Sequence, residues 1–262
     1  MLKLLKYEWK ACARTCLPLY GVLILMSLIS RILYVIPKNA SLDFMLPAIS
    51  SMLYMGVMMA AFVVTAVILI QRFYKNLLGS EGYLMFTLPV TVSQHLLSKT
   101  IIAVVMIALS GIAAFLSIGI FADMSFGTLF VDMIKGVARS GGLLFGLELL
   151  VLAVLGIAGM ALFVYMCMAL GHLAGKHRLL MSVVWYVVLS TALQVLLLMV
   201  MMGAGNAVPE PFVDLMKVWW SGITPMGAAH LMLRFCCVFT LLSDAVYFLV
   251  TRWILVHKLN LE

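Results

Sequence analysis

The stretch that decides the fold is LLFGLELLVLAVLGIAGMALFVYMCMAL, residues 143–170. Glu148 is its only charged residue, and the other positions are apolar, small or weakly polar. A helix needs about 20 residues to cross about 30 Å of hydrocarbon, because each residue adds about 1.5 Å along the axis. The stretch is long and apolar enough to predict a transmembrane helix.

Five further apolar runs of similar length lie before and after this stretch. They cover residues 17–36, 46–70, 101–122, 179–202 and 228–255. Of the 262 residues, 65% are hydrophobic and 10% are charged, whereas a soluble domain is about half apolar and about a quarter charged. This composition excludes an ordinary water-soluble protein. We predict an all-α integral membrane protein with six transmembrane helices in one membrane domain, residues 1–262.

Basic residues are unevenly distributed along the chain. Eleven lie at the two ends or in the loops after the second and fourth runs: Lys3, Lys6, Lys10, Arg14, Arg72, Lys75, Lys99, Lys176, Arg178, Arg252 and Lys258. The other side has five: Arg31, Lys38, Lys135, Arg139 and Lys217. Basic residues accumulate on the cytoplasmic side of membrane proteins, so both termini are predicted to be cytoplasmic. The net charge of +7 is then a topology signal, and nucleic acid is not an expected partner.

Two segments are predicted to lie at the membrane surface. Residues 1–15 form an amphipathic helix, because the basic residues Lys3, Lys6, Lys10 and Arg14 share one arc at about 100° per residue. Glu8 projects from the opposite, apolar arc, either as a solvated edge residue or in a buried salt bridge to a cytoplasmic loop. Residues 203–226 form an external segment, whose Trp219 and Trp220 suit the interface.

The longest cytoplasmic connection, residues 71–98, carries signals for a short helix. Gly79 can end the preceding long helix in a left-handed cap. Ser80 can begin the short helix, and Pro89 stops it. Thr91 and Gln94 fit a capping box that begins the third transmembrane helix.

The predicted short helix carries unusually apolar side chains for a loop between two membrane helices. Tyr83, Met85 and Phe86 are the largest of them. Such a patch indicates a docking surface for a partner. The alternative is that these side chains are buried among the lipid headgroups.

The predicted spans contain the charged residues Glu148, Arg234 and Asp244, besides Arg31 and Arg252 closer to span ends. Each costs about 2.5–3.5 kcal/mol on insertion scales and is tolerated mainly when paired or facing a wet cavity. Glu148 and Arg234 lie at similar depths below the outer ends of their helices, which predicts a salt bridge, and Arg31 reaches the same level. These residues either form a polar part of a translocation path or lock helices together as ion pairs.

Catalytic motifs are missing from the sequence. The segment GHLAGKHR, residues 171–178, differs from a phosphate-binding loop because its glycine spacing is short and His177 replaces the hydroxyl residue. Cys12 and Cys16 have helical spacing but no nearby set of metal-binding partners. We expect no catalytic residue, metal site or cofactor in this chain.

Three parts of the sequence carry a family resemblance. They are LKLLKYEWK at residues 2–10, RFYKNLLGSEGYLMFTLPV at residues 72–90 and GHLAGKHR at residues 171–178. With them, the whole chain resembles the membrane subunits of ABC-2 type exporters, especially the small six-helix permeases of Gram-positive bacteria. Within this family it is most similar to permeases that expel amphipathic helical toxin peptides, such as the phenol-soluble modulin exporter.

The resemblance implies that ATP is hydrolysed by a separate subunit. The coupling helix that docks on this cytoplasmic ATPase would contain Glu81, Gly82, Tyr83, Met85, Phe86 and Pro89. A second, shorter coupling turn would contain Lys176, His177 and Arg178. The exporter would comprise two copies of the ATPase, which bind ATP and Mg, and a second permease as a homodimer or related heterodimer. Peptides would cross the bacterial cell membrane between the two permeases.

Other functions fit the same sequence features. The chain could be a subunit of a drug or lipid exporter, because the family includes such members. An ion-coupled secondary carrier would use Glu148 or Asp244. A third alternative is a membrane protein for immunity or sensing that transports nothing.

Overall fold

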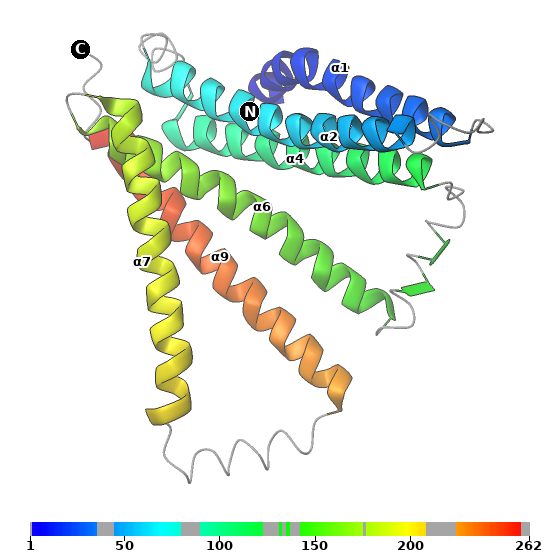
Figure 1. The fold of residues 1–262 in the computed structure, drawn as a ribbon. Coiled ribbons are helices and arrows are strands. Elements are labelled where there is room, and N and C mark those ends of the chain that lie inside the picture. Colours follow the sequence, from blue (N-terminus) through cyan, green and yellow to red (C-terminus); the bar gives the residue numbers. More distant parts are fainter. Residues whose placement is uncertain are drawn as a thin grey trace. The chain divides into compact units, whose positions relative to one another are not determined.

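The computed structural model describes residues 2–35, 45–79, 90–122, 131–132, 135–136, 142–174, 177–207 and 224–257. Six long helices account for most of these residues (Figure 1). They are α1 (Leu2–Val35), α2 (Met45–Phe73), α4 (Val92–Phe121), α6 (Gly142–His172), α7 (Arg178–Ala207) and α9 (Pro225–His257). A short π-helical turn, η1 (Tyr74–Leu78), continues α2. Within these ranges the structure has no β-strand.

All six long helices have the length and hydropathy of membrane spans. Their apolar segments contain 23 to 34 residues, and each overlaps one of the six predicted runs. The prediction of an all-α chain with six membrane-spanning helices is thereby confirmed, and it indicates a multi-pass membrane protein. The cytoplasmic location of the termini stays a prediction.

Helix α1 differs from the expected separate surface helix at residues 1–15. One continuous helix runs from Leu2 to Val35, and Pro18 lies inside it. A proline removes one backbone hydrogen bond, but membrane helices tolerate it where neighbouring groups compensate. The basic residues Lys3, Lys6, Lys10 and Arg14 are exposed as predicted, and they belong to the first turns of the long helix.

The described helices gather into two compact units, Met1–Ser140 and Gly141–Glu262. In the first unit, α1, α2 and α4 pack against one another. Polar contacts cross between these helices at several levels. The Tyr20 hydroxyl donates to the Met106 carbonyl at 3.1 Å, and Tyr54 contacts Ser117 at 2.9 Å. Hydrogen bonds between polar side chains stabilise helix packing in membranes, where the hydrophobic effect between helices is absent.

The second unit is built around α6, which packs against both α7 and α9. Gly171 allows the close approach of α6 to α7, because a Cβ atom there would overlap the side chain and backbone of Ser182. From this region α7 and α9 diverge towards the ends that carry Ala207 and Pro225 (Figure 1). Most residues of α7 and α9 are consequently exposed.

The predicted coupling segment is described only at its two ends. Gly79 follows η1 with φ −91° and ψ −175°, so the predicted left-handed cap is wrong and the chain leaves the helix in an extended conformation. At the other end the predicted capping box is present, and the Thr91 backbone N–H donates to Gln94 Oε1 at 3.3 Å. Helix α4 therefore begins at Val92, well before the predicted apolar run at 101.

Candidate functional site

The Glu148 cluster joins α6 to α9 through one carboxylate and two basic side chains. Arg234 donates from Nε to Glu148 Oε1 at 2.8 Å, and His230 Nδ1 lies 2.6 Å from Oε2. The predicted pairing of Glu148 with Arg234 is therefore present. His230 was not predicted, although His230 and Arg234 are four residues apart and lie on the same face of a helix.

The environment of this cluster is only partly buried. Glu148 has a side-chain exposure of 15%, whereas that of Arg234 is 68%. The ring of Phe145 packs edge-on against His230 with centroids 5.6 Å apart. The cluster therefore holds a carboxylate between two helices and directs an exposed guanidinium outward.

Asp244 is the second charged site of this unit, and it has a different environment. Its side chain is buried, and within the described part of the chain neither carboxylate oxygen has a hydrogen-bond partner. The carboxylate lies against α6 at Gly159, where a Cβ atom would overlap it. The ion-pair interpretation of Asp244 finds no described partner, so this residue differs from Glu148.

Arg31 lies in the first unit, where it donates from Nη1 to the Ile120 carbonyl at 3.1 Å. Ile120 is in the last turn of α4, whose carbonyls lack partners within the helix. An arginine at this position donates a hydrogen bond to such a carbonyl, and its positive charge interacts favourably with the negative end of the helix dipole. The contact gives Arg31 a structural role at the end of α4.

Glu8 forms a buried ion cluster that ties three helix ends together. Lys99 Nζ of α4 donates to Glu8 Oε1 at 2.9 Å, and Arg72 Nη2 of α2 lies 3.5 Å from Oε2. Lys99 and Glu8 have side-chain exposures of 4% and 9%. Of the two interpretations of Glu8, the buried salt bridge is present, and its partners lie in long helices rather than in a loop.

Most residues of the predicted coupling elements lie outside the described residues. This holds for Glu81, Gly82, Tyr83, Met85, Phe86, Pro89 and Lys176. His177 is described and has a positive φ of 58°, which is uncommon for a residue other than glycine. Arg178 begins α7 directly after it.

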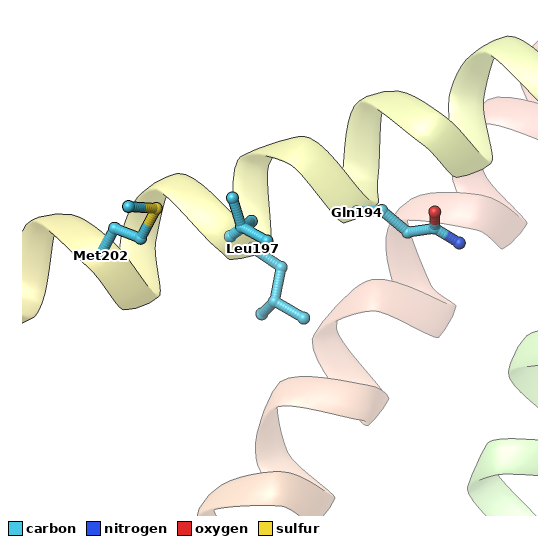
Figure 2. A pocket seen from close by; sticks show the side chains of 4 residues that line it. Gln194, Leu197 and Met202 are labelled. Carbon is cyan, nitrogen blue, oxygen red and sulfur yellow. The ribbon is translucent and has the colours of Figure 1, made fainter.

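Two of the cavities among the described residues of the second unit are lined by α7. One, of about 360 Å³, has walls from α6, α7 and α9 and includes Asp244. The other, of about 440 Å³, is lined by Gln194, Leu197, Leu198 and Met202 of α7. Figure 2 shows Gln194 and Leu197 projecting from α7 on the side where α9 runs. Three of the four lining residues are apolar, and we call this second cavity the α7 groove.

The described charged residues therefore form two ion clusters between helices, at Glu8 and Glu148, and one buried carboxylate at a cavity, Asp244. Among the described residues, no group of three or more His, Cys, Asp or Glu side chains is placed to hold a metal ion. Comparison of the chain with models of protein families, with curated proteins and with solved structures gives no match. The functional argument consequently rests on the residues and their geometry.

Proposed function

We propose that the chain is the membrane-spanning permease subunit of an ATP-driven exporter of the ABC-2 type, which expels amphipathic or hydrophobic peptides from a bacterial cell. ATP hydrolysis would take place in a separate cytoplasmic ATPase. Two ATPase copies and a second permease would complete the transporter. The proposal follows the resemblance of residues 2–10, 72–90 and 171–178 to that family.

The observation that carries the proposal is that the Glu8 cluster joins the two helices that flank the predicted coupling helix in the chain. Arg72 precedes residues 80–89 in the chain and Lys99 follows them, and both contact the same buried carboxylate. A force applied to the segment would therefore move α1, α2 and α4 together instead of bending one helix. Such a rigid connection is what coupling to an external ATPase requires.

The peptide cargo is supported by the apolar character of the second unit. Helix α7 exposes Leu193, Leu196, Leu197, Val200 and Met202. Flexible leucine and methionine side chains can adapt to helices of different sequence. An amphipathic peptide could contact such a surface from the membrane without entering a narrow polar pore.

The test targets Tyr83 and Phe86 of the coupling helix. We expect Tyr83→Ala with Phe86→Ala to release the ATPase or to uncouple ATP hydrolysis from transport, because a buried interface aromatic contributes about 2 kcal/mol or more. The double variant is compared with the wild type for co-purified ATPase and for hydrolysis stimulated by peptide. Both are measured after equal membrane levels are confirmed.

A matched control removes two exposed aromatic rings elsewhere. Phe62 of α2 and Phe115 of α4 are 39% and 43% exposed. Phe62→Ala with Phe115→Ala should leave the ATPase bound. If the Tyr83 and Phe86 variant retains the ATPase and its stimulation as well, the coupling assignment is incorrect.

An ion-coupled carrier is a second candidate, favoured by the buried carboxylate of Asp244 without a described partner. Such a carboxylate can bind and release an ion during transport. The two functions predict different energy sources. Transport that stops when the proton gradient collapses and is insensitive to ATP depletion would favour the carrier, and the opposite result favours the exporter.

A further inference from the structure

The cavity at Asp244 combines one buried carboxylate with apolar and aromatic walls. Its lining includes Met160 and Phe163 of α6, Leu193 of α7, and Phe239 and Tyr247 of α9. Met160 and Phe239 are 71% and 61% exposed, so the cavity opens at the surface of the helices. Its volume of about 360 Å³ lies within the range of about 300–1,000 Å³ for small-molecule sites.

The polar groups of this cavity are disposed to accept hydrogen bonds. Four hydroxyl-bearing side chains line it. Three of them, Ser190, Thr240 and Ser243, donate their hydrogen to a carbonyl of their own helix, and the fourth is the phenol of Tyr247. A hydroxyl whose hydrogen is used still offers oxygen lone pairs, and an ionised carboxylate is an acceptor only. A matching ligand would therefore supply N–H donors and a positive charge.

Gly159 makes room for the Asp244 carboxylate, whose two oxygens are buried at the wall of this cavity. A Cβ atom at Gly159 would overlap Asp244 Oδ1 and would lie 3.4 Å from Cγ. At Gly156, one turn earlier, a Cβ atom would meet nothing within 4 Å. The carboxylate therefore occupies space that glycine leaves free at position 159.

The cavity walls also suit an organic cation, because aromatic rings can contact its charged head and apolar side chains can contact its hydrocarbon tail. Phe163 packs against Tyr247 with ring centroids 5.4 Å apart, and aromatic faces attract cations. Leu193 lines the cavity, and Leu197, one turn further along α7, lines the α7 groove. A hydrocarbon tail could extend along this groove while the charged head remains at Asp244.

We infer that this cavity binds the ammonium group of an amphiphilic amine, with Asp244 as its counter-ion and the α7 groove holding its apolar tail. Pairing offsets the cost of keeping a carboxylate among apolar helices. The ammonium can belong to a free alkylamine or to a lysine of an amphipathic peptide. Binding needs no ATPase, so the site goes beyond the proposed export function and can be tested apart from it.

The test uses the full-length protein in lipid nanodiscs and a photoreactive alkylamine with a diazirine in its tail. Labelled peptides are identified by mass spectrometry, and decylamine or decanol is added as competitor. We expect saturable labelling of α7 or α9 that decylamine prevents and decanol does not. Asp244→Asn should weaken binding by about tenfold to a hundredfold, as expected for the loss of hydrogen bonds to a charged group.

Variants of the same region separate loss of the site from loss of folding. Asp244→Glu should retain most of the binding, because it keeps the charge. Gly159→Ala should weaken binding by displacing the carboxylate, whereas Gly156→Ala, the matched change one turn away, should bind as the wild type does. Unchanged labelling in Asp244→Asn, or equal competition by decanol, would show that the cavity selects only apolar groups and would overturn the inference.

A further comparison identifies the source of the ammonium. Two amphipathic helical peptides are tested as competitors of the photoreactive amine. One contains a single lysine, and the other has norleucine at that position. Competition by the lysine peptide alone assigns the site to peptide side chains. Competition by decylamine and by neither peptide assigns it to free amines. If competition by decylamine and by the lysine peptide is the same in Asp244→Asn as in the wild type, the site is rejected.

Discussion

The two units of the chain differ in how far their helices bury one another. In α1, α2 and α4, 28%, 22% and 39% of the apolar stretch is buried, whereas the values for α6, α7 and α9 are 17%, 0% and 6%. The first unit also has hydrogen bonds between helices at several levels. In the second unit, Asp244 has no described partner.

This difference indicates that the two units have different tasks. The first unit joins its helices through hydrogen bonds and the Glu8 cluster, as expected of a rigid support. The second unit leaves apolar surface, cavities and a buried carboxylate for contacts with lipid, a ligand or another chain. Substitutions that test internal contacts should therefore have large effects in the first unit and smaller ones in the second.

The largest effect is expected in the Glu8 cluster. Glu8→Gln leaves Lys99 buried without its counter-ion, and breaking a buried pair in this way costs about 3–5 kcal/mol. The free energy of unfolding would be measured by circular dichroism in mixed micelles with increasing SDS. The double variant Glu8→Gln with Lys99→Met should lose less than Glu8→Gln alone, because it removes the isolated charge. Additive losses would contradict a strongly coupled pair.

A smaller effect is expected at the contact between α6 and α7 in the second unit. Gly171→Ala places a methyl group against the Ser182 backbone, so the helices must separate, and such overpacking typically costs about 1–3 kcal/mol. Gly156→Ala on the same helix is the control, because its methyl group meets nothing within 4 Å. The same SDS titration measures both variants. Equal stability of the two would mean that α7 is held by something other than this contact.

Hydropathy predicted the helices because it reports how deep each residue lies in the membrane. The six runs, the capping box at Thr91 and the salt bridge between Glu148 and Arg234 all follow from depth or from local sequence. Hydropathy does not report which neighbour a residue faces around the helix axis. A buried salt bridge of Glu8 was therefore only one of two alternatives. Its partner Lys99, 91 residues away, and the cavity at Asp244 were not predicted.

Local signals failed where packing between helices decided the outcome. The basic arc predicted an amphipathic surface helix at residues 1–15, but this segment continues without a break into the first membrane span, and its Cys12 and Ala13 are buried. Continuing α1 without a break allows these residues to pack and keeps the backbone hydrogen bonds satisfied. His230 lies inside the predicted run at 228–255, and its contact with Glu148 was not predicted because hydropathy does not show which neighbour a side chain faces.

The smallest effect is expected for the pair of Glu148 and Arg234, which distinguishes it from the Glu8 cluster. Arg234 has a side-chain exposure of 68%, so after Glu148→Gln its long side chain can move towards water or headgroups. After Arg234→Gln, Glu148 still contacts His230. Each single variant should therefore lower the free energy of unfolding in the same SDS titration only slightly, and the double variant should recover part of the loss. Arg252→Gln, an exposed position near the other end of α9, is the control for loss of a basic residue. A loss as large as that of Glu8→Gln would show that the second unit depends on its internal ion pair as much as the first, and the distinction between the units would not hold.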